Sequence, residues 1–292
     1  MKDKRSKEMF GVSELPKIDF GLADVLHNAE EAAGQLSISG VQPKLSVKLD
    51  KKNNKLISAA KGGEYILKPQ TASYPNIPEN EQCCMDMAEA FNIEVPPHCL
   101  IPLQDGTLAY IVKRFDRQKG EKFAQEHFAQ MLERPEKYDG TVEQIGKMLR
   151  KISTAPGLDN QLLFERVVFS FIIGNGDAHL KNYSVLTKGD EIRLSPAYDL
   201  ICSRIVLTKE KWESALGIGR NKGKRNNLNR KDFDDLGGYL GVPEDVRYEK
   251  FEKQFERMKE IIGNSRLDQN KQAQFTAVIQ ERLSRLGLSG EV

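Results

Sequence analysis

Apolar and polar residues alternate along much of the first half of the chain. Short apolar or alternating runs recur there, separated by polar or glycine-containing turns, at 45–49, 56–58, 65–68, 98–103 and 108–112. Such runs bounded by turn residues predict strands joined as hairpins. One helix is expected among them. It begins at Pro78, with acidic residues in its first turn, and ends before Pro96.

Helical periodicity dominates the second half. Helices are predicted at 123–132, 142–152 and 161–173, with Asp159 as a cap for the third. Two short strands at 183–186 and 192–195 follow, and the chain from Arg230 onward reads as helical with an interruption at Gly237-Gly238. The expected fold class is therefore α+β in two lobes, a β-rich lobe over 1–113 and a helical lobe over 114–292.

Composition and charge narrow the possible functions. The 292 residues carry 44 Lys and Arg against 42 Asp and Glu, a net charge of +2, which does not favour a nucleic-acid coat or a polybasic membrane anchor. No apolar run reaches the ~20 residues that span a bilayer. The N-terminus is charged and has no apolar core of a secretory signal. The four cysteines form no C-x-x-C pair, so we expect a reduced, cytoplasmic protein that does not contact membranes.

The glycine-rich stretch from Gly174 to Tyr183 is the most informative for chemistry. Within it, Asp177 and Asn182 are separated by four residues, the D-x-x-x-x-N spacing of a kinase catalytic loop. In that chemistry a carboxylate accepts or orients a hydroxyl proton, and an amide oxygen holds Mg²⁺ beside the transferring phosphate. Lys181 lies between them and is suited to offset developing phosphoryl charge.

Three further features, at other places along the chain, suit phosphoryl transfer. Asp199 follows the second short strand and is a candidate metal ligand. Lys68 ends a predicted strand, where it is suited to pair with phosphates, and Glu81 on the next helix is suited to orient it. A turn around Gly40 precedes the first strand and is suited to present backbone N–H groups to phosphate.

Taken singly, each feature also has a plain structural explanation. An Asp in a glycine-rich turn is commonly a turn former, a strand-end lysine is commonly solvated, and Asp199 also suits a helix N-cap. Their order along the chain favours the catalytic interpretation.

Four motifs together resemble the HipA-type serine/threonine kinases. They are Ser37-Ile-Ser-Gly-Val-Gln-Pro-Lys44, Lys113-Arg-Phe-Asp-Arg117, Gly176-Asp-Ala-His-Leu-Lys-Asn182 and Ser195-Pro-Ala-Tyr-Asp-Leu200. The resemblance runs from about Gln35 to near the C-terminus. It implies a kinase-like two-lobed fold, ATP and Mg²⁺ as cofactors, and a protein kinase of a toxin–antitoxin system.

The resemblance also implies residue roles. Asp177 matches the catalytic carboxylate, and Asn182 and Asp199 match the metal ligands. Autophosphorylation, which silences the family's kinases, would fall on Ser37 or Ser39. The implied nucleotide-binding set is Ser39, Gly40, Val41, Gln42, Lys44, Lys68, Lys113, Phe115, Asp116, His179, Lys181 and Tyr198.

Only 36 residues precede Ser37, so the chain looks like the short HipT variant, whose N-terminal subdomain is a separate small protein. The resemblance implies that protein, an antitoxin and a protein substrate as partners, with DNA reached only through the antitoxin. The family's known targets are aminoacyl-tRNA synthetases.

Two other functions stay open at this stage. The D-x-x-x-x-N loop does not distinguish acceptor hydroxyls, so a small-molecule or lipid kinase is one alternative. A non-catalytic kinase-like module acting on DNA through an antitoxin is the other. The basic segment from Gly217 to Arg230 has five positive charges and no acid; it fits a solvated hairpin, or a contact with DNA or a tRNA-bound substrate.

Overall fold

The computed structural model describes residues 2–33, 43–59, 61–118, 120–207, 210–219 and 223–288. The chain forms two compact units. The first comprises Met1–Gln82 and Pro96–Arg117, and the second comprises Cys83–Val95 and Gln118–Val292. One helix, α3 (Ile77–Ala90), therefore begins in the first unit and ends in the second.

The first unit is built on a six-stranded sheet in the order β1-β3-β2-β4-β6-β5. Its strands are β1 (Lys17–Ile18), β2 (Leu45–Asp50), β3 (Lys55–Ser58), β4 (Tyr65–Pro69), β5 (His98–Pro102) and β6 (Leu108–Lys113). All neighbours pair antiparallel except β1 with β3. The hairpins predicted from alternation are thus present.

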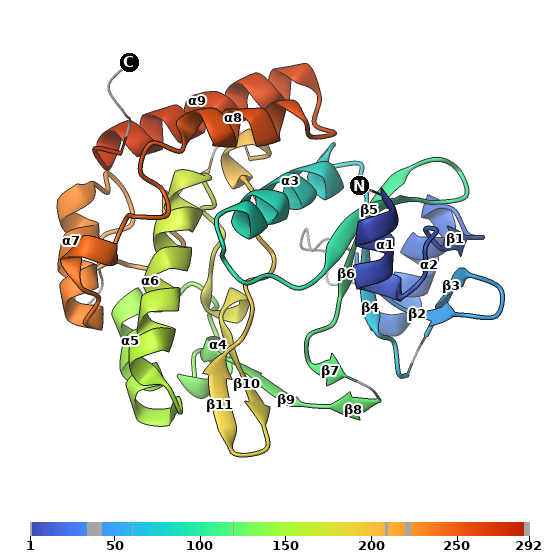
Figure 1. Ribbon diagram of the computed structural model, residues 1–292, viewed down its shortest axis with the longest axis horizontal. Helices are drawn as coiled ribbons and strands as arrows, with labels where there is room; N and C mark the ends of the chain where they lie inside the picture. Colours follow the sequence, from blue (N-terminus) through green and yellow to red (C-terminus); the bar gives the residue numbers. More distant parts are fainter. Residues whose placement is uncertain are drawn as a thin grey trace. The chain divides into compact units, whose positions relative to one another are not determined.

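Two helices precede most of this sheet, α1 (Lys2–Phe10) and α2 (Leu22–Ala33) (Figure 1). Val25 of α2 packs in the same buried cluster as Val47, Leu67 and Ile111 of the sheet. From α1, the backbone carbonyl of Met9 accepts a hydrogen bond of 2.9 Å from the Tyr65 hydroxyl. Alternate residues of β2 and β4 supply the core, as expected for a sheet with one buried face.

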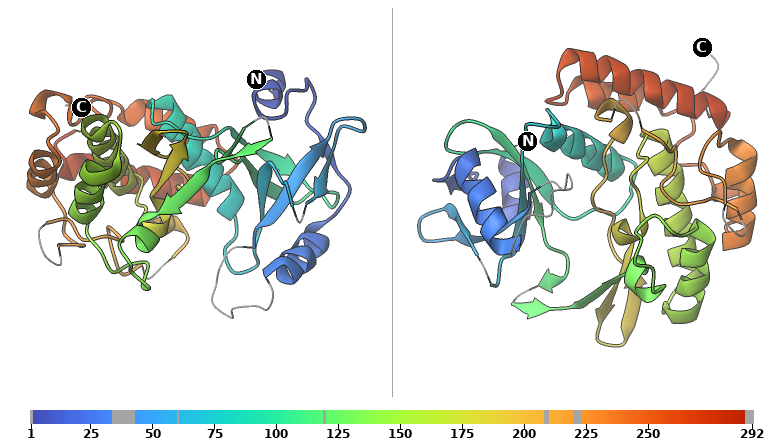
Figure 2. Two further views of the ribbon diagram at one scale, coloured as in Figure 1. Left: turned by 90° about the horizontal axis from the view of Figure 1, so that it is seen from below. Right: turned by 180° about the vertical axis from the view of Figure 1, so that it is seen from behind.

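The second unit is mainly helical. Its helices are the rest of α3, α4 (Phe128–Met131), α5 (Val142–Ile152), α6 (Pro156–Ile172), α7 (Arg230–Leu240), α8 (Phe255–Gly263) and α9 (Gln269–Arg285), with three short 3₁₀ turns at Leu180–Asn182, Ser203–Ile205 and Glu244–Val246. Helix α6 is buried nearly all round, with Phe164, Val168 and Ile172 inaccessible. Figure 2 shows α5 beside α6 and α8 beside α9 in both views.

A three-stranded sheet in the order β11-β10-β9 completes the second unit. Its strands are β9 (Ala124–His127), β10 (Ser184–Lys188) and β11 (Glu191–Leu194), and the chain reaches β9 through the short strands β7 (Arg117–Gln118) and β8 (Glu121–Lys122).

The helix predicted over 123–132 is wrong for its first half. Residues Ala124–His127 form β9, which pairs antiparallel with β10, and only Phe128–Met131 is helical. The side chain of His127 accepts a hydrogen bond of 3.1 Å from the backbone N–H of Gln130 and so caps this short helix. Pairing with a distant strand has overridden the local periodicity.

Asp159 is not the cap of α6, because that helix begins at Pro156. Asp159 is instead fully buried, where its carboxylate accepts hydrogen bonds from the Ser153 hydroxyl at 2.6 Å and the Leu194 N–H at 2.9 Å, and it forms an ion pair with Arg193 at 3.0 Å. It therefore ties α6 to β11.

The expected interruption at Gly237-Gly238 is also wrong, since α7 runs through both glycines. A Cβ atom at Gly237 would lie 2.5 Å from Nε of Arg247. The glycine thus admits a buried arginine against the helix, which explains its presence without a break in the helix.

Candidate active site

The candidate catalytic loop follows directly from the end of α6. Gly174 has φ +69°, the left-handed conformation that commonly terminates a helix. A Cβ atom there would lie 2.8 Å from Val278 on α9, so the close approach also requires glycine. The N–H of Asn175 donates to the carbonyl of Ser170 at 2.8 Å. The helix end therefore fixes where the loop begins.

Asp177 is held by its neighbours through one carboxylate oxygen. The Tyr138 hydroxyl donates a hydrogen bond of 2.6 Å to Oδ1, and the Lys137 ammonium lies 3.8 Å from the same atom. Burial, together with the Asp177 carboxylate, raises the pKa of Tyr138 above its usual range, so the phenol keeps its proton. The Asp177 side chain is 38% exposed, which leaves Oδ2 accessible to a hydroxyl.

Asn182 and Asp199 lie together in the second unit. Asn182 Nδ2 is 3.5 Å from Asp199 Oδ2, while Asn182 Oδ1 accepts a hydrogen bond of 3.2 Å from the His179 N–H. Asp199 has φ +56°, a strained backbone conformation for a residue with a side chain, which is common at functional sites. A carboxylate and an amide oxygen are hard oxygen donors of the kind that Mg²⁺ prefers, so the residues fit that ion.

His179 is a neutral imidazole at pH 7. Burial lowers its pKa to about 4, against the opposing influence of Asp177. The ring packs edge-on against Tyr138, with ring centres 5.5 Å apart. Its Nδ1 atom is buried without a hydrogen-bond partner among the described residues. The side chain therefore contributes packing and a potential hydrogen bond rather than charge.

Ser203 and Glu210 form hydrogen bonds that hold the loop in place, a role that the sequence did not reveal. The Gly176 N–H donates to Ser203 Oγ at 2.7 Å, and Ser203 Oγ also contacts the carbonyl of Gly174 at 3.0 Å and the carboxyl group of Glu210. Burial raises the pKa of Glu210 to about 7. The Ser203 hydroxyl donates to Glu210 Oε1, a hydrogen bond that opposes the effect of burial on this pKa.

This pKa predicts how stability depends on pH. The unfolded carboxyl group ionises near its usual 4.5 while the folded one keeps its proton to about pH 7, so this group makes the folded state less stable as pH rises between those values. We expect Glu210→Gln to flatten the pH dependence. At pH 8 its melting temperature should exceed that of the unmodified protein by about 2–4 °C, which corresponds to roughly 1 kcal/mol. Thermal melts at pH 5.5 and pH 8 measure this; a variant that loses more stability at pH 8 than at pH 5.5 contradicts it.

Lys68 and Glu81 form a buried ion pair in the first unit. Lys68 lies on β4 and Glu81 near the start of α3, and Lys68 Nζ is 2.5 Å from Glu81 Oε1. The two residues are 3% and 1% exposed, and the ammonium lies 5.4 Å from the centre of the Tyr110 ring. The pairing anticipated from the sequence is therefore present, and the role of Lys68 toward phosphate stays a prediction.

The segment after β6 contains a second ion pair. The Arg114 guanidinium binds both oxygens of Asp116, at 2.9 Å and 2.7 Å. Burial alone would raise the pKa of Asp116, but Arg114 holds it below its usual value. In this structure Asp116 is thus bound to Arg114, and its contact with the nucleotide stays a prediction. Lys113 precedes the pair, Phe115 lies between its two members, and both are partly buried.

The remaining predicted residues differ in placement. Lys181 is exposed, and its carbonyl accepts a hydrogen bond of 2.9 Å from the Tyr198 hydroxyl. Lys44 is exposed just before β2. The predictions for Ser37, Ser39, Gly40, Val41 and Gln42 fall outside the described residues.

Sequence reasoning missed Tyr138 and Glu210 because neither lies in a motif. Tyr138 is 39 residues before Asp177, and no local spacing connects them. Arg114 lies inside the Lys113–Arg117 motif. Its position two residues before Asp116 was the signal from which an ion pair could have been predicted.

None of the helices in the described part of the chain is long and apolar enough to cross a membrane.

Comparison with solved structures identifies the fold as kinase-like. The chain is similar to HipA of Shewanella oneidensis, solved in complex with HipB and operator DNA, with TM-score 0.70 and 20% identity over 87% of this chain and 66% of that one. It is also similar to CtkA, a proinflammatory kinase of Helicobacter pylori, with TM-score 0.56 and 15% identity over 82% of this chain and 93% of that one.

The model of the HipA-like C-terminal domain matches residues 36–281, and the chain belongs to that family. A Haemophilus influenzae protein is 25% identical over 94% of this chain and 89% of its own length. Two Sinorhizobium fredii proteins, Y4dM and Y4mE, are 34% and 31% identical, and this chain spans 60% and 50% of them. The names of all three propose that they are kinases.

Proposed function

We propose that this protein is an ATP- and Mg²⁺-dependent serine/threonine protein kinase. The observation that carries the proposal is the arrangement around the loop after α6. Asp177 is fixed through Oδ1 by Tyr138, and Asn182 lies 3.5 Å from Asp199 on the same unit. The family and the names of the relatives support a kinase as the class of enzyme.

In the proposed reaction, the acceptor hydroxyl oxygen forms a bond to the γ-phosphorus as the bond to the ADP oxygen breaks. Asp177 Oδ2 orients this hydroxyl and takes its proton, because Oδ1 is already engaged by Tyr138. The hydrogen bond from Tyr138 to Oδ1 restrains the orientation of the Asp177 carboxylate, which limits the positions available to the acceptor hydroxyl.

Asn182 and Asp199 are the residues that would hold Mg²⁺, which supplies charge neutralisation on the β- and γ-phosphates when bound with ATP. In the first unit, the Lys68 ammonium is the proposed partner of the nucleotide phosphates, and Glu81 fixes its position. His179 stays neutral and so adds no positive charge.

We extend the proposal to a toxin of a toxin–antitoxin system. Similarity to a HipA solved with HipB and operator DNA supports an antitoxin partner, with DNA reached through it. Autophosphorylation of Ser37 or Ser39, and an aminoacyl-tRNA synthetase as substrate, rest on the motif resemblance.

The nucleotide part of the proposal predicts that Asp199→Asn loses most of its stabilisation by Mg·ATP. Asparagine keeps the size of the side chain and tolerates the positive φ of this position, so the backbone is preserved. A ligand at 100 times its Kd stabilises a protein by about 2.7 kcal/mol, and a hundredfold weaker affinity removes nearly all of this. Thermal melts with and without Mg·ATP measure the difference.

Asp190→Asn is the matched control, since Asp190 is an exposed acid in the turn between β10 and β11 of the same unit. It should keep the full Mg·ATP shift. Equal shifts in the Asp199→Asn and unmodified proteins would contradict the assignment of Asp199.

A further inference from the structure

The second unit contains a cavity of about 630 Å³, a volume typical of ligand sites. Among the described residues, one wall comes from the segment 134–144, which leads into α5. The other comes from Trp212 and residues 223–226, which follow Asp199 along the chain. None of the residues that line it belongs to the proposed catalytic or nucleotide-binding set.

Both walls are attached to the catalytic loop. Tyr138, which binds Asp177, immediately precedes the lining residue Asp139, and the Leu180 N–H donates to the carbonyl of Lys137 at 3.0 Å. On the other wall, a Cβ atom at Gly176 would lie 2.5 Å from the carbonyl oxygen of Trp212. The cavity therefore adjoins the loop that carries Asp177.

The lining is cationic. It contains Arg134, Lys224 and Arg225 against one carboxylate, Asp139. Lys224 also pairs at 2.8 Å with Asp232, which is not part of the lining. Arg225 donates to the backbone carbonyl of Tyr138, a contact that does not neutralise its charge. Arg134 Nη1 pairs with Asp139 at 3.1 Å, but both side chains are substantially exposed, so this pair is weak. Arg134 Nε is buried and has no hydrogen-bond partner among the described residues. A donor of this kind favours an incoming oxygen acceptor.

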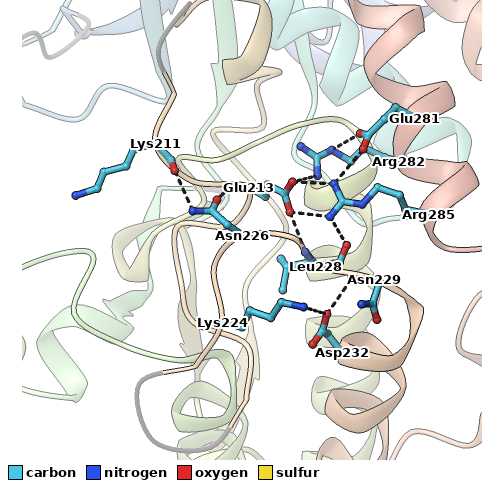
Figure 3. Close-up of polar contacts among 10 residues, drawn as sticks. All are labelled: Lys211, Glu213, Lys224, Asn226, Leu228, Asn229, Asp232, Glu281, Arg282 and Arg285. Carbon is cyan, nitrogen blue, oxygen red and sulfur yellow. Dashed lines mark hydrogen bonds and ion pairs between the residues drawn. The ribbon is translucent and has the colours of Figure 1, made fainter.

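The wall that carries Trp212 is held in place by a network of polar contacts (Figure 3). The amide of Asn226 binds the carbonyl of Lys211 at 3.2 Å and the N–H of Glu213 at 3.0 Å. Arg285 on α9 binds both carboxylate oxygens of Glu213, at 2.7 Å and 2.9 Å. Although burial opposes ionisation, Arg285 and Arg282 lower the pKa of Glu213 to about 2, so the network persists throughout the physiological pH range.

We propose that this cavity binds an acidic segment of the acceptor protein, close to the hydroxyl that receives the phosphate. The proposal rests on the proposed kinase function and names the substrate class of that same site. Carboxylate side chains match the net positive charge of the lining, above all Arg225, which donates to a neutral carbonyl, and the Arg134 Nε donor. A pre-formed wall lowers the entropic cost of binding.

A peptide fits these walls better than a nucleic acid does. Asp139 lies among the lining residues and repels anionic groups of either ligand. A peptide can place a neutral residue beside it, whereas a nucleic acid carries a phosphate at every step. The side-chain amides of Gln144 and Asn226 are also part of the lining and suit the polar groups of a peptide.

Trp212 is the only tryptophan in the chain, so its fluorescence reports on this wall alone. The probes are short serine peptides flanked by Asp and Glu, and the same peptides with Asn and Gln. They are titrated without nucleotide into the 292-residue protein at low salt. We expect a saturable change with the acidic peptide and a response to the neutral peptide at least tenfold weaker.

Two lining variants should act in opposite directions. Arg134→Gln should weaken acidic-peptide binding about threefold to tenfold, and Asp139→Asn should strengthen it about twofold to fivefold. Lys259→Gln is the matched control, because Lys259 is an exposed cation on α8. It should leave the affinity unchanged.

Equal binding of the acidic and neutral peptides, or an unchanged affinity in Arg134→Gln, would overturn the proposal. Tighter binding of a single-stranded oligonucleotide that Arg134→Gln abolishes would overturn it in favour of a nucleic acid. Because binding is read without ATP, a protein that binds the acidic peptide but transfers no phosphate contradicts the kinase assignment and leaves the acidic-segment site standing.

Discussion

Replacing Lys68 by methionine is expected both to destabilise the protein and to abolish its use of ATP. Glu81 is 1% exposed and pairs with Lys68 at 2.5 Å, so the variant leaves a buried carboxylate without this cation. Breaking one side of a buried pair typically costs about 3–5 kcal/mol. We expect the melting temperature to fall by roughly 6–20 °C, measured by thermal melts.

The double variant Lys68→Met, Glu81→Gln separates structure from catalysis. It also neutralises Glu81, so most of the stability should return, because a neutral replacement of both partners of a buried pair is often close to neutral in free energy. ATP turnover should stay absent, since the ammonium group is still missing. A stable double variant with normal turnover would show that Lys68 has only a structural role.

Replacing Asp177 by alanine should have the largest effect on activity. A positioned acid or base typically contributes about 10²–10⁴ in rate, so phosphoryl transfer should fall by at least a hundredfold. The side chain is 38% exposed. Stability should therefore change by less than about 1 kcal/mol. Initial rates of ADP formation and a thermal melt on the same sample test both statements.

Tyr138→Phe is the control for this experiment, because it removes the hydrogen bond to Oδ1 and keeps the carboxylate. We expect a moderate loss of rate, well short of that in Asp177→Ala. Similar losses in the two variants would mean that the carboxylate acts by holding Tyr138 in place. Full activity in a folded Asp177→Ala protein would remove Asp177 from the mechanism.

The strands of the first unit were predictable because their signals are local. Alternation over 45–49 and turn residues between short apolar runs correctly located β2 to β6. The pairing of Lys68 with Glu81 could also be predicted from the sequence, since the two residues are only 13 positions apart, one near the end of a strand and one near the start of the next helix. The four motifs and their order along the chain were sufficient to predict the family correctly.

The features that escaped prediction depend on contacts between distant segments. Residues Ala124–His127 have a helical pattern, yet they pair with β10, about 60 residues away. Asp159 looks like a helix cap, but it is buried against Ser153 and β11. Glu210 lies in no motif, and its raised pKa arises mainly from burial, with a further contribution from the Asp177 carboxylate. Local patterns carry no information on such partners.

Phosphoamino-acid analysis after incubation with γ-labelled Mg·ATP and a cell lysate is the most direct test of the proposed function. The account predicts label on serine or threonine of one or a few proteins, absent when Asp177→Ala replaces the unmodified protein. Label confined to lipid or small-molecule extracts, with none on protein hydroxyls, would contradict a protein kinase and favour the alternative class of acceptor.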